Sequence, residues 1–213
     1  MQKTSQNVYD YLYQKEGQAP WTFEEPPEEL AKLVESGMIK SCKTLDVGCG
    51  EGYISTYLAS KGFDVTGIDI SSNAINLAKK HAAKRGVKCK FMQMEWKQLS
   101  KIKDKFDFIL DWRFLHEVAN DKEREVYVNL VSNLLKRRGT YLSVAFSGEF
   151  KKWGKGKLRK SPIGTILCLP HNRDLEKLFA EDFDIIKKSM IKLQQKDLPG
   201  GVTSYFFLME KRN

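Results

Sequence analysis

Short apolar runs alternate with segments of helical spacing over residues 43–147. The runs typical of buried strands are 43–47, 63–70, 87–93, 106–111 and 140–147. Helical spacing is predicted between them, ending at Gly62, over 73–85 from a cap at Ser71 or Ser72 to Gly86, and over 122–138 from Asp121 to Gly139. This alternation predicts a largely parallel sheet with helices on both faces.

The pattern changes after residue 147. Residues 148–164 form a basic, glycine-containing stretch that is too long for a plain connector and is typical of a binding segment or lid. A helix is predicted over 172–179, and strands over 183–193 and 202–210 are separated by a short turn, so they should be antiparallel. The predicted fold class is α/β: a Rossmann-like three-layer α/β/α sandwich, with a mostly parallel seven-stranded sheet and an antiparallel last strand.

Composition narrows the class of protein. The 213 residues are 41% hydrophobic and 30% charged, which fits a soluble globular domain and excludes intrinsic disorder. The apolar runs are far shorter than the ~20 residues that span a bilayer. The first residues lack the apolar region of a secretory signal, and the four cysteines form no C-x-x-C pair. We therefore expect a cytoplasmic protein with no disulfide, no metal site and no membrane partner.

Charge is distributed unevenly. The net charge is +9, yet residues 1–30 contain two lysines and six acidic residues. Cations gather at 79–90, the end of a predicted helix, where they suit the helix dipole and solvent. A second cluster, at 151–160, has six cations and no anion in a predicted loop. That cluster leaves nucleic acid open as a partner.

The central signal for function is the run TLDVGCGEGYIS at 44–55. Its three glycines permit a sharp turn from strand to helix and let a ligand approach free helix N–H groups. A dinucleotide-binding turn would place its third glycine at position 53, where this chain has tyrosine, so the spacing disfavours NAD. Asp69 ends the next predicted strand, where a carboxylate can accept hydrogen bonds from a ribose diol.

The glycine-rich run together with VTGIDIS at 65–71 resembles the class I S-adenosylmethionine (SAM) dependent methyltransferases. The resemblance implies that the turn faces the methionine part of SAM and that Asp69 holds the ribose hydroxyls. It also implies that Glu95, where the family more often has Asp, meets the adenine amine. The expected cofactor site comprises Asp46, Gly48, Cys49, Gly50, Gly52, Asp69, Ile70, Glu95, Trp96, Asp111 and Trp21.

The stretch FDFILDWRFLHEV at 106–118 holds the candidate catalytic residues, Asp111, Arg113 and His116. They follow a predicted strand, and ligands of open α/β sheets bind outside the carboxyl ends of the strands. Methyl transfer is an in-line displacement that depends mostly on alignment. His116 or Asp111 is a candidate base for an acceptor thiol, amine or hydroxyl, and Arg113 for pairing with an anionic acceptor.

The PWTFEEPPEEL entrance and the Asp-Trp-Arg stretch resemble small-molecule enzymes near the thiopurine and tellurite-resistance methyltransferases. This resemblance implies a lid formed by an N-terminal helix with its tyrosines, and Trp21 packed over the cofactor or the acceptor. Trp153 and His171 flank the late loop and are candidates to line the acceptor pocket. We expect a single domain over 1–213, divided into an N-terminal lid over 1–36, a cofactor-binding core over 40–147, and an acceptor loop with the last strands over 148–213.

Two other functions remain open. An RNA methyltransferase is the first, although the Asp/Asn-Pro-Pro-aromatic motif of amino-group enzymes is missing after 106–111, and Cys168 lies in a predicted strand rather than beside a proline as a C5 nucleophile would. A non-catalytic SAM-binding regulatory module is the second. The predicted function is SAM-dependent methylation of a small-molecule acceptor at S, N or O, with S-adenosylhomocysteine as product. The sequence leaves the acceptor and the oligomeric state open.

Overall fold

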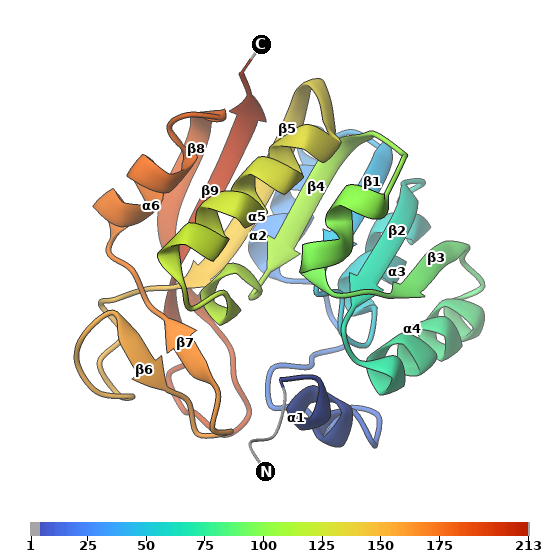
Figure 1. The fold of residues 1–213 in the computed structure, drawn as a ribbon. Helices are drawn as coiled ribbons and strands as arrows, with labels where there is room; N and C mark the ends of the chain where they lie inside the picture. Colours follow the sequence, from blue (N-terminus) through green and yellow to red (C-terminus); the bar gives the residue numbers. More distant parts are fainter. Residues whose placement is uncertain (1–4, 213) are drawn as a thin grey trace. The chain divides into compact units, whose positions relative to one another are not determined.

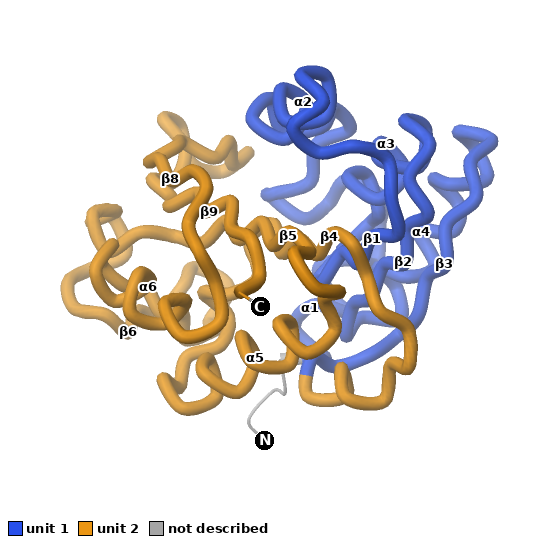
Figure 2. The backbone as a smooth tube through the Cα atoms, turned by 90° about the horizontal axis from the view of Figure 1, so that it is seen from above, with its two compact units in different colours: residues 1–96 blue, residues 97–213 orange. Residues whose placement is uncertain are grey.

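A computed structural model describes residues 5–212 of the chain. It divides into two compact units, Met1–Trp96 and Lys97–Asn213, which we describe separately (Figure 2). The expectation of a single domain stays a prediction.

Unit 1 contains three parallel strands, β1 (Lys43–Val47), β2 (Asp64–Asp69) and β3 (Cys89–Gln93), in the spatial order β3-β2-β1 (Figure 1). Its helices are α1 (Ser5–Leu12), α2 (Glu28–Glu35), α3 (Tyr53–Ser60) and α4 (Ser72–Arg85). The predicted caps of α4 are confirmed: the Ser71 side chain accepts the Ala74 N–H, and Gly86 ends the helix in the left-handed conformation.

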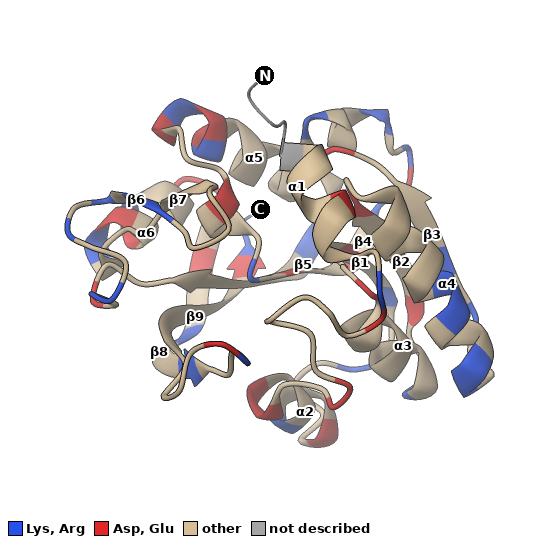
Figure 3. Ribbon diagram, turned by 90° about the horizontal axis from the view of Figure 1, so that it is seen from below, with Lys and Arg blue, Asp and Glu red and all other residues tan. Residues whose placement is uncertain are grey.

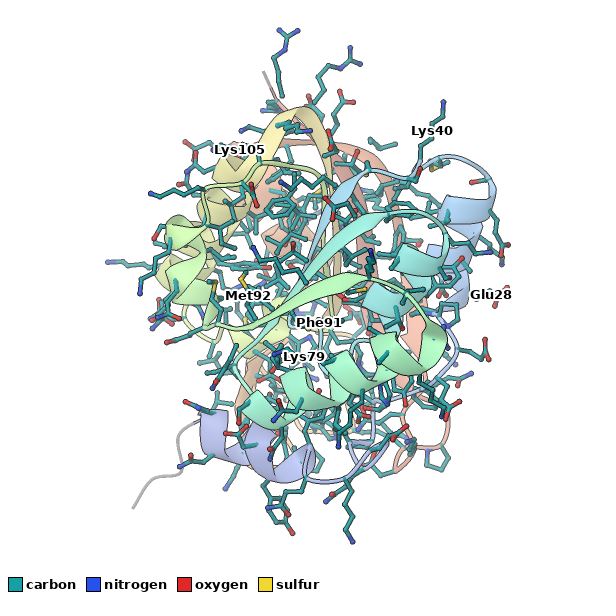
Figure 4. The ribbon with its side chains drawn as sticks, turned by 90° about the vertical axis from the view of Figure 1, so that its right-hand side faces the viewer. Glu28, Lys40, Lys79, Phe91, Met92 and Lys105 are labelled. Atoms are coloured by element: carbon teal, nitrogen blue, oxygen red, sulfur yellow. The ribbon has the colours of Figure 1, made fainter. Side chains whose placement is uncertain are left out.

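The core of unit 1 joins α4 to its sheet. Phe91 of β3 packs against Ile75, Ala78 and Ala82 on the buried face of α4, while Lys79 lies on the same helix (Figure 4). A β-carbon on Gly67 of β2 would lie 2.8 Å from the Phe91 ring. The absence of a side chain at position 67 therefore lets this ring lie directly on the strand.

Unit 2 contains four strands of the main sheet: β4 (Phe106–Trp112), β5 (Leu135–Phe146), β8 (Phe183–Leu193) and β9 (Val202–Lys211). Strands β4 and β5 are parallel, and β9 runs antiparallel to both of its neighbours, β5 and β8. The unit also contains η2 (Leu115–Glu117), α5 (Asp121–Leu134) and α6 (Asn172–Phe179), and a short helical turn, η1 (Trp96–Lys101), spans the division between the units.

Two predictions for unit 2 were wrong. The N-cap of α5 is Asn120 rather than Asp121, since the Asn120 side chain accepts the Glu123 N–H. The helix ends at Leu134 instead of continuing to residue 138, because Leu135 is buried and pairs with Phe106 as the start of β5. The pairing of β4 with β5 is then irregular until Thr140 pairs with Phe108.

A small hairpin begins within the basic stretch that was predicted as a loop. Strands β6 (Leu158–Lys160) and β7 (Ile166–Cys168) pair in an antiparallel two-stranded sheet. Cys168 therefore lies in a strand, as the sequence predicts.

The predicted fold class is confirmed. The strand order is β3-β2-β1 in unit 1 and β4-β5-β9-β8 in unit 2, and within each unit neighbouring strands are parallel except where β9 meets β5 and β8. Within residues 5–212, no helix is both long and apolar enough to cross a membrane.

Candidate functional site

The glycine-rich turn lies between β1 and α3 in unit 1. Its three glycines, Gly48, Gly50 and Gly52, have φ angles of 72°, 53° and 76°, which L side chains rarely adopt. A β-carbon on Gly50 would lie 2.9 Å from the Tyr13 hydroxyl, and one on Gly52 would lie 2.7 Å from the Ala78 β-carbon. Glycine is therefore required both by the backbone conformation and by the close approach of Tyr13 and Ala78.

Asp69 lies at the end of β2, with its carboxylate against this turn. Its side chain accepts the Gly50 N–H at 3.0 Å through Oδ2 and the Ser71 N–H at 2.9 Å through Oδ1. The residue is only 8% exposed. Burial raises the pKa of Asp69 to about 6, against the lowering effect of the two N–H groups.

Asp46 supports the turn from within. It is buried at the end of β1 and accepts the Ser55 hydroxyl of α3 at 2.6 Å. Burial raises the pKa of this carboxyl to about 7. The N–H groups of Gly48 and Cys49 both donate to the Ile68 carbonyl, which joins the turn to the end of β2. Cys49 and Ile70 are half-buried.

Glu95 and Trp96 follow β3. The Met94 N–H donates to the Asp69 carbonyl at 2.8 Å, which brings the start of this segment to the end of β2. Glu95 is exposed, and Trp96 is half-buried. The predicted cofactor residues of unit 1 thus surround the ends of β1, β2 and β3, while Asp111 belongs to unit 2 and is considered below.

The N-terminal segment, which we define as residues 8–22, lies over the turn. Tyr13 follows α1, is 5% exposed, and accepts the Trp21 indole N–H at 2.8 Å. Trp21 also contacts Tyr9 edge-on, with ring centroids 6.1 Å apart. Burial and the Asp69 charge both hold the pKa of Tyr13 well above 10, so its hydroxyl stays protonated.

Two carboxylates that the sequence did not single out attach this segment to the turn and to α4. Glu51, inside the glycine-rich turn, is 3% exposed and accepts the Gly17 N–H at 2.9 Å and the Thr22 hydroxyl at 3.0 Å. Asp10 of α1 accepts the Ser71 hydroxyl at 2.7 Å at the start of α4, beside which α1 lies (Figure 1). The sequence signal that could have identified Glu51 is an acidic residue inside the glycine-rich run G-C-G-E-G.

A histidine provides a third attachment. His81 of α4 is buried; its Nδ1 donates to the Glu51 carbonyl at 2.7 Å, and its Nε2 lies 2.9 Å from Glu16 Oε1 in the N-terminal segment. The His81 ring also stacks on Tyr53 with centroids 4.3 Å apart. Hydrogen bonding and charge from His81 lower the pKa of Glu16, so this carboxylate stays ionised.

Asp111 in unit 2 is occupied by its own neighbours. The residue is fully buried at the end of β4, and three hydroxyls donate to its carboxylate, from Tyr127 of α5 at 2.8 Å, from Ser143 of β5 at 2.9 Å, and from Tyr141. Burial raises the pKa of Asp111 to about 7. This arrangement joins α5 to the sheet; a role for Asp111 in binding or catalysis stays a prediction.

His116 lies in η2 and is 2% exposed. Its Nδ1 accepts the Phe146 N–H at 3.3 Å, and its ring stacks on Phe146 with centroids 3.7 Å apart. Burial and the charges of Arg113 and Arg124 lower the pKa of His116 well below 6.5. The ring is therefore neutral, with its proton on Nε2, and its role as a base stays a prediction.

Arg113 directly follows β4 with a φ of 72°, one of two non-glycine residues with positive φ among those described. Its guanidinium donates to the Gln194 carbonyl at 2.8 Å and to Gln195 Oε1 at 2.9 Å, and lies 5.2 Å from the centre of the Phe146 ring. Trp153 contacts both Phe146 and Phe150 edge-on. Unit 2 thus brings Arg113, His116 and Trp153 around the Phe146 ring.

Cations of the basic cluster at 151–160 form contacts within unit 2. Arg159 is 6% exposed and donates to the carbonyls of Gly156, Phe150 and Gly148, and Lys157 pairs with Asp121 at 2.7 Å. The other concentration of cations lies along α4 (Figure 3). Over the described residues no group of acidic, histidine and cysteine side chains is arranged to hold a metal ion, and the four cysteines form no disulfide.

A strand, a glycine-rich turn at a helix start, and an acidic residue at the end of the next strand define a nucleotide-type cofactor site on a Rossmann-like sheet. A family model described as a methyltransferase domain matches residues 39–198. The chain belongs to this methyltransferase domain family, which confirms the resemblance seen in the sequence.

Known proteins similar to the chain include the ubiquinone biosynthesis O-methyltransferase of Pelagibacter ubique. It is 30% identical over 167 residues, which cover 75% of this chain and 65% of the relative. Across the first curated relatives, the chain spans between 40% and 65% of their length.

Two solved structures share the fold. One is a 1,6-didemethyltoxoflavin-N1-methyltransferase from Burkholderia thailandensis with bound 1,6-didemethyltoxoflavin and S-adenosylhomocysteine, with a TM-score of 0.75, 18% identity, and coverage of 97% of this chain and 88% of that one. The other is TehB from Haemophilus influenzae, with a TM-score of 0.71, 20% identity, and coverage of 96% and 67%.

Proposed function

We propose that the protein transfers a methyl group from SAM to a small-molecule acceptor and releases S-adenosylhomocysteine. One observation carries the proposal: Asp69, at the end of β2, is held against the left-handed Gly50 by the Gly50 and Ser71 N–H groups. A carboxylate has about four lone-pair positions, so two remain for a ribose diol. Family membership supports the same proposal.

The residues around the turn fit SAM. Gly50 lets the Tyr13 hydroxyl lie close to the turn, since a β-carbon at this position would lie 2.9 Å from that hydroxyl. Tyr13 and Trp21 provide aromatic surface and one linked pair of polar groups in a buried setting. We propose that Asp69 holds the ribose hydroxyls, that the turn and the N-terminal segment enclose the methionine part, and that Glu95 and Trp96 lie at the adenine.

Bound SAM supplies an electrophilic methyl group on a sulfonium. The protein's own contribution is to hold both reactants in line and to exclude water, and alignment of this kind accounts for up to ~7–11 kcal/mol of a barrier. The contacts of Glu51, Asp10 and Glu16 hold the N-terminal segment over the turn, and the segment thereby shields the turn from solvent. In unit 2, we propose that Arg113 and His116 orient the acceptor, with His116 neutral.

A small molecule is favoured over RNA as the acceptor. The relative from Pelagibacter ubique is named for ubiquinone biosynthesis, and the Burkholderia thailandensis neighbour holds a toxoflavin precursor. In addition, Arg159 and Lys157 of the basic cluster are engaged within unit 2, which reduces the charge available to a phosphate backbone.

Calorimetric titration with S-adenosylhomocysteine tests the proposal, with NAD as the comparison ligand. We expect saturable binding of S-adenosylhomocysteine alone, with little change between low and high salt. Asp69→Ala should abolish this binding, whereas Asp64→Ala, an exposed carboxylate on the same strand, should leave it intact. Equal affinity in the wild type and in Asp69→Ala would overturn the assignment of Asp69.

A further inference from the structure

Arg124, in the first turn of α5, is a buried cation that has no carboxylate partner among residues 5–212. The residue is 2% exposed, and its Nη1 donates to the sulfur of Cys168 on β7. Its Nε is buried and makes no hydrogen bond to any described residue, and no ion pair involves this side chain over residues 5–212. A thiol is a weak acceptor, so the guanidinium is poorly compensated for its loss of water.

Among the described residues, no carboxylate of this region pairs with Arg124. Asp111 accepts three hydroxyls, and Asp121, whose charge reaches Cys168, pairs with Lys157 on the surface. Glu117 lies 3.8 Å from His116 Nε2 and is one quarter exposed. Burial without a counter-charge is strongly destabilising, so the site favours a bound anion.

Neighbouring groups extend this positive site toward an aromatic surface. Arg124 contacts Cys168 of β7, and β7 packs against η2, which contains the buried His116; the Nε2 of His116 carries a proton available for donation. His116 stacks on Phe146, which in turn contacts Trp153. Donors for an anion and the faces of aromatic rings therefore occur together after the ends of β4 and β5, where open α/β sheets bind ligands.

We propose that Arg124 and His116 form a subsite for the anionic group of an aromatic methyl acceptor, such as a carboxylate, phenolate or thiolate on a planar ring. This assignment rests on the proposed function and deepens it by naming the class of acceptor. Arg124 supplies the charge and the fork of donors, and His116 supplies one neutral donor. Neither residue is required to remove a proton.

Benzoate and the neutral, equally shaped benzamide are suitable probes at constant ionic strength. Histidine ring signals in NMR spectra report the location, because His81, on α4 of unit 1, is an internal reference that does not belong to the subsite. We expect benzoate to shift the His116 signals saturably and benzamide to leave them unchanged. Arg124→Met should weaken benzoate binding about 10- to 100-fold, as expected for loss of a charged hydrogen-bonding partner.

Two further variants separate charge from folding. Arg137→Met removes an exposed arginine of β5 and should leave benzoate affinity unchanged. Arg124→Lys keeps the charge but loses the planar fork, and should give an intermediate affinity even if Arg124→Met fails to fold. Equal binding of benzoate and benzamide by the wild-type protein, or wild-type benzoate affinity in a folded Arg124→Met, would overturn the subsite.

Titration with S-adenosylhomocysteine on the same samples distinguishes the two proposals. Binding of S-adenosylhomocysteine without discrimination between the probes would reject the subsite and retain the methyltransferase. Discrimination between the probes without any binding of S-adenosylhomocysteine would retain an anion site and reject the proposed function on which the acceptor assignment rests.

Discussion

Replacing Glu51 with glutamine should loosen the N-terminal segment while the sheet stays folded. The carboxylate of Glu51 is almost fully buried and accepts the Gly17 N–H at 2.9 Å and the Thr22 hydroxyl at 3.0 Å. Glutamine keeps the shape but presents a neutral oxygen to one donor and an NH₂ group to the other. Both donors, Gly17 and Thr22, belong to the N-terminal segment, so the effect should be local.

The magnitude follows from the change of acceptor. A hydrogen bond to a charged group contributes about 1.5–3 kcal/mol, against about 0.5–1.5 kcal/mol for a neutral one. A net loss of about 1–2 kcal/mol for the attachment corresponds to about a 5- to 30-fold increase in the population with the segment detached. If the ligand requires the attached segment, affinity for S-adenosylhomocysteine should fall only by the factor by which the attached fraction decreases, so hydrogen exchange is the more sensitive measurement.

Amide hydrogen exchange measures this directly. Protection at Gly17 and Thr22 should decrease about 5- to 30-fold, while protection in β1 and β4 stays unchanged. Thr22→Val removes one of the two bonds and should give a smaller decrease, and Glu25→Gln, an exposed carboxylate, should give none. Unchanged protection at Gly17 in Glu51→Gln, or an equal loss throughout the sheet, would refute the idea of a local attachment.

Four further outcomes are expected. The affinity for S-adenosylhomocysteine should fall as the pH decreases below about 6, where Asp69 gains a proton and loses an acceptor; calorimetry of Asp69→Asn should show weak binding with a flat pH profile. Gly50→Ala should lower the free energy of unfolding by about 1–2 kcal/mol, because its φ of 53° strains an L residue and its β-carbon meets Tyr13; urea titration measures this, and wild-type stability would contradict it. If His116 takes a proton from the acceptor, the rate should show a limb well below pH 6.5 that disappears in His116→Gln; an unchanged profile would remove it as the base. The raised pKa of Asp111 means that its contribution to stability is complete below about pH 4 and is lost as the pH rises through about 7, so Asp111→Asn should flatten the pH dependence of unfolding by up to about 4 kcal/mol, and identical slopes in both proteins would reject this.

The local parts of the site could be predicted from the sequence. The strand, the glycine-rich turn and Asp69 are set by short-range spacing, and the structure places Asp69 against Gly50 with a hydrogen bond of 3.0 Å. The α5 cap was missed by one residue because Asn120 and Asp121 are both good N-cap residues. Its C-terminus was missed because pairing of Leu135 with Phe106 overrides helix propensity.

Contacts between distant parts of the chain could not be predicted. Glu51 meets Thr22 across 29 residues and Asp10 meets Ser71 across 61, and nothing in the local pattern pairs them. Asp111 has the position of a ligand-facing carboxylate in the sequence, yet its neighbours Tyr127 and Tyr141 lie on other elements and donate to it. Such assignments depend on tertiary packing rather than on periodicity.

Ser71 forms hydrogen bonds that join β2, α1 and the start of α4. Its N–H donates to Asp69, its hydroxyl donates to Asp10, and the same oxygen accepts the Ala74 N–H at the start of α4. Of the other side chains, threonine alone offers a hydroxyl with the same reach and both bonding roles. Evolutionary drift at this position should therefore be confined to serine and threonine for as long as position 10 is acidic, and the two positions should change together in descendants of this chain.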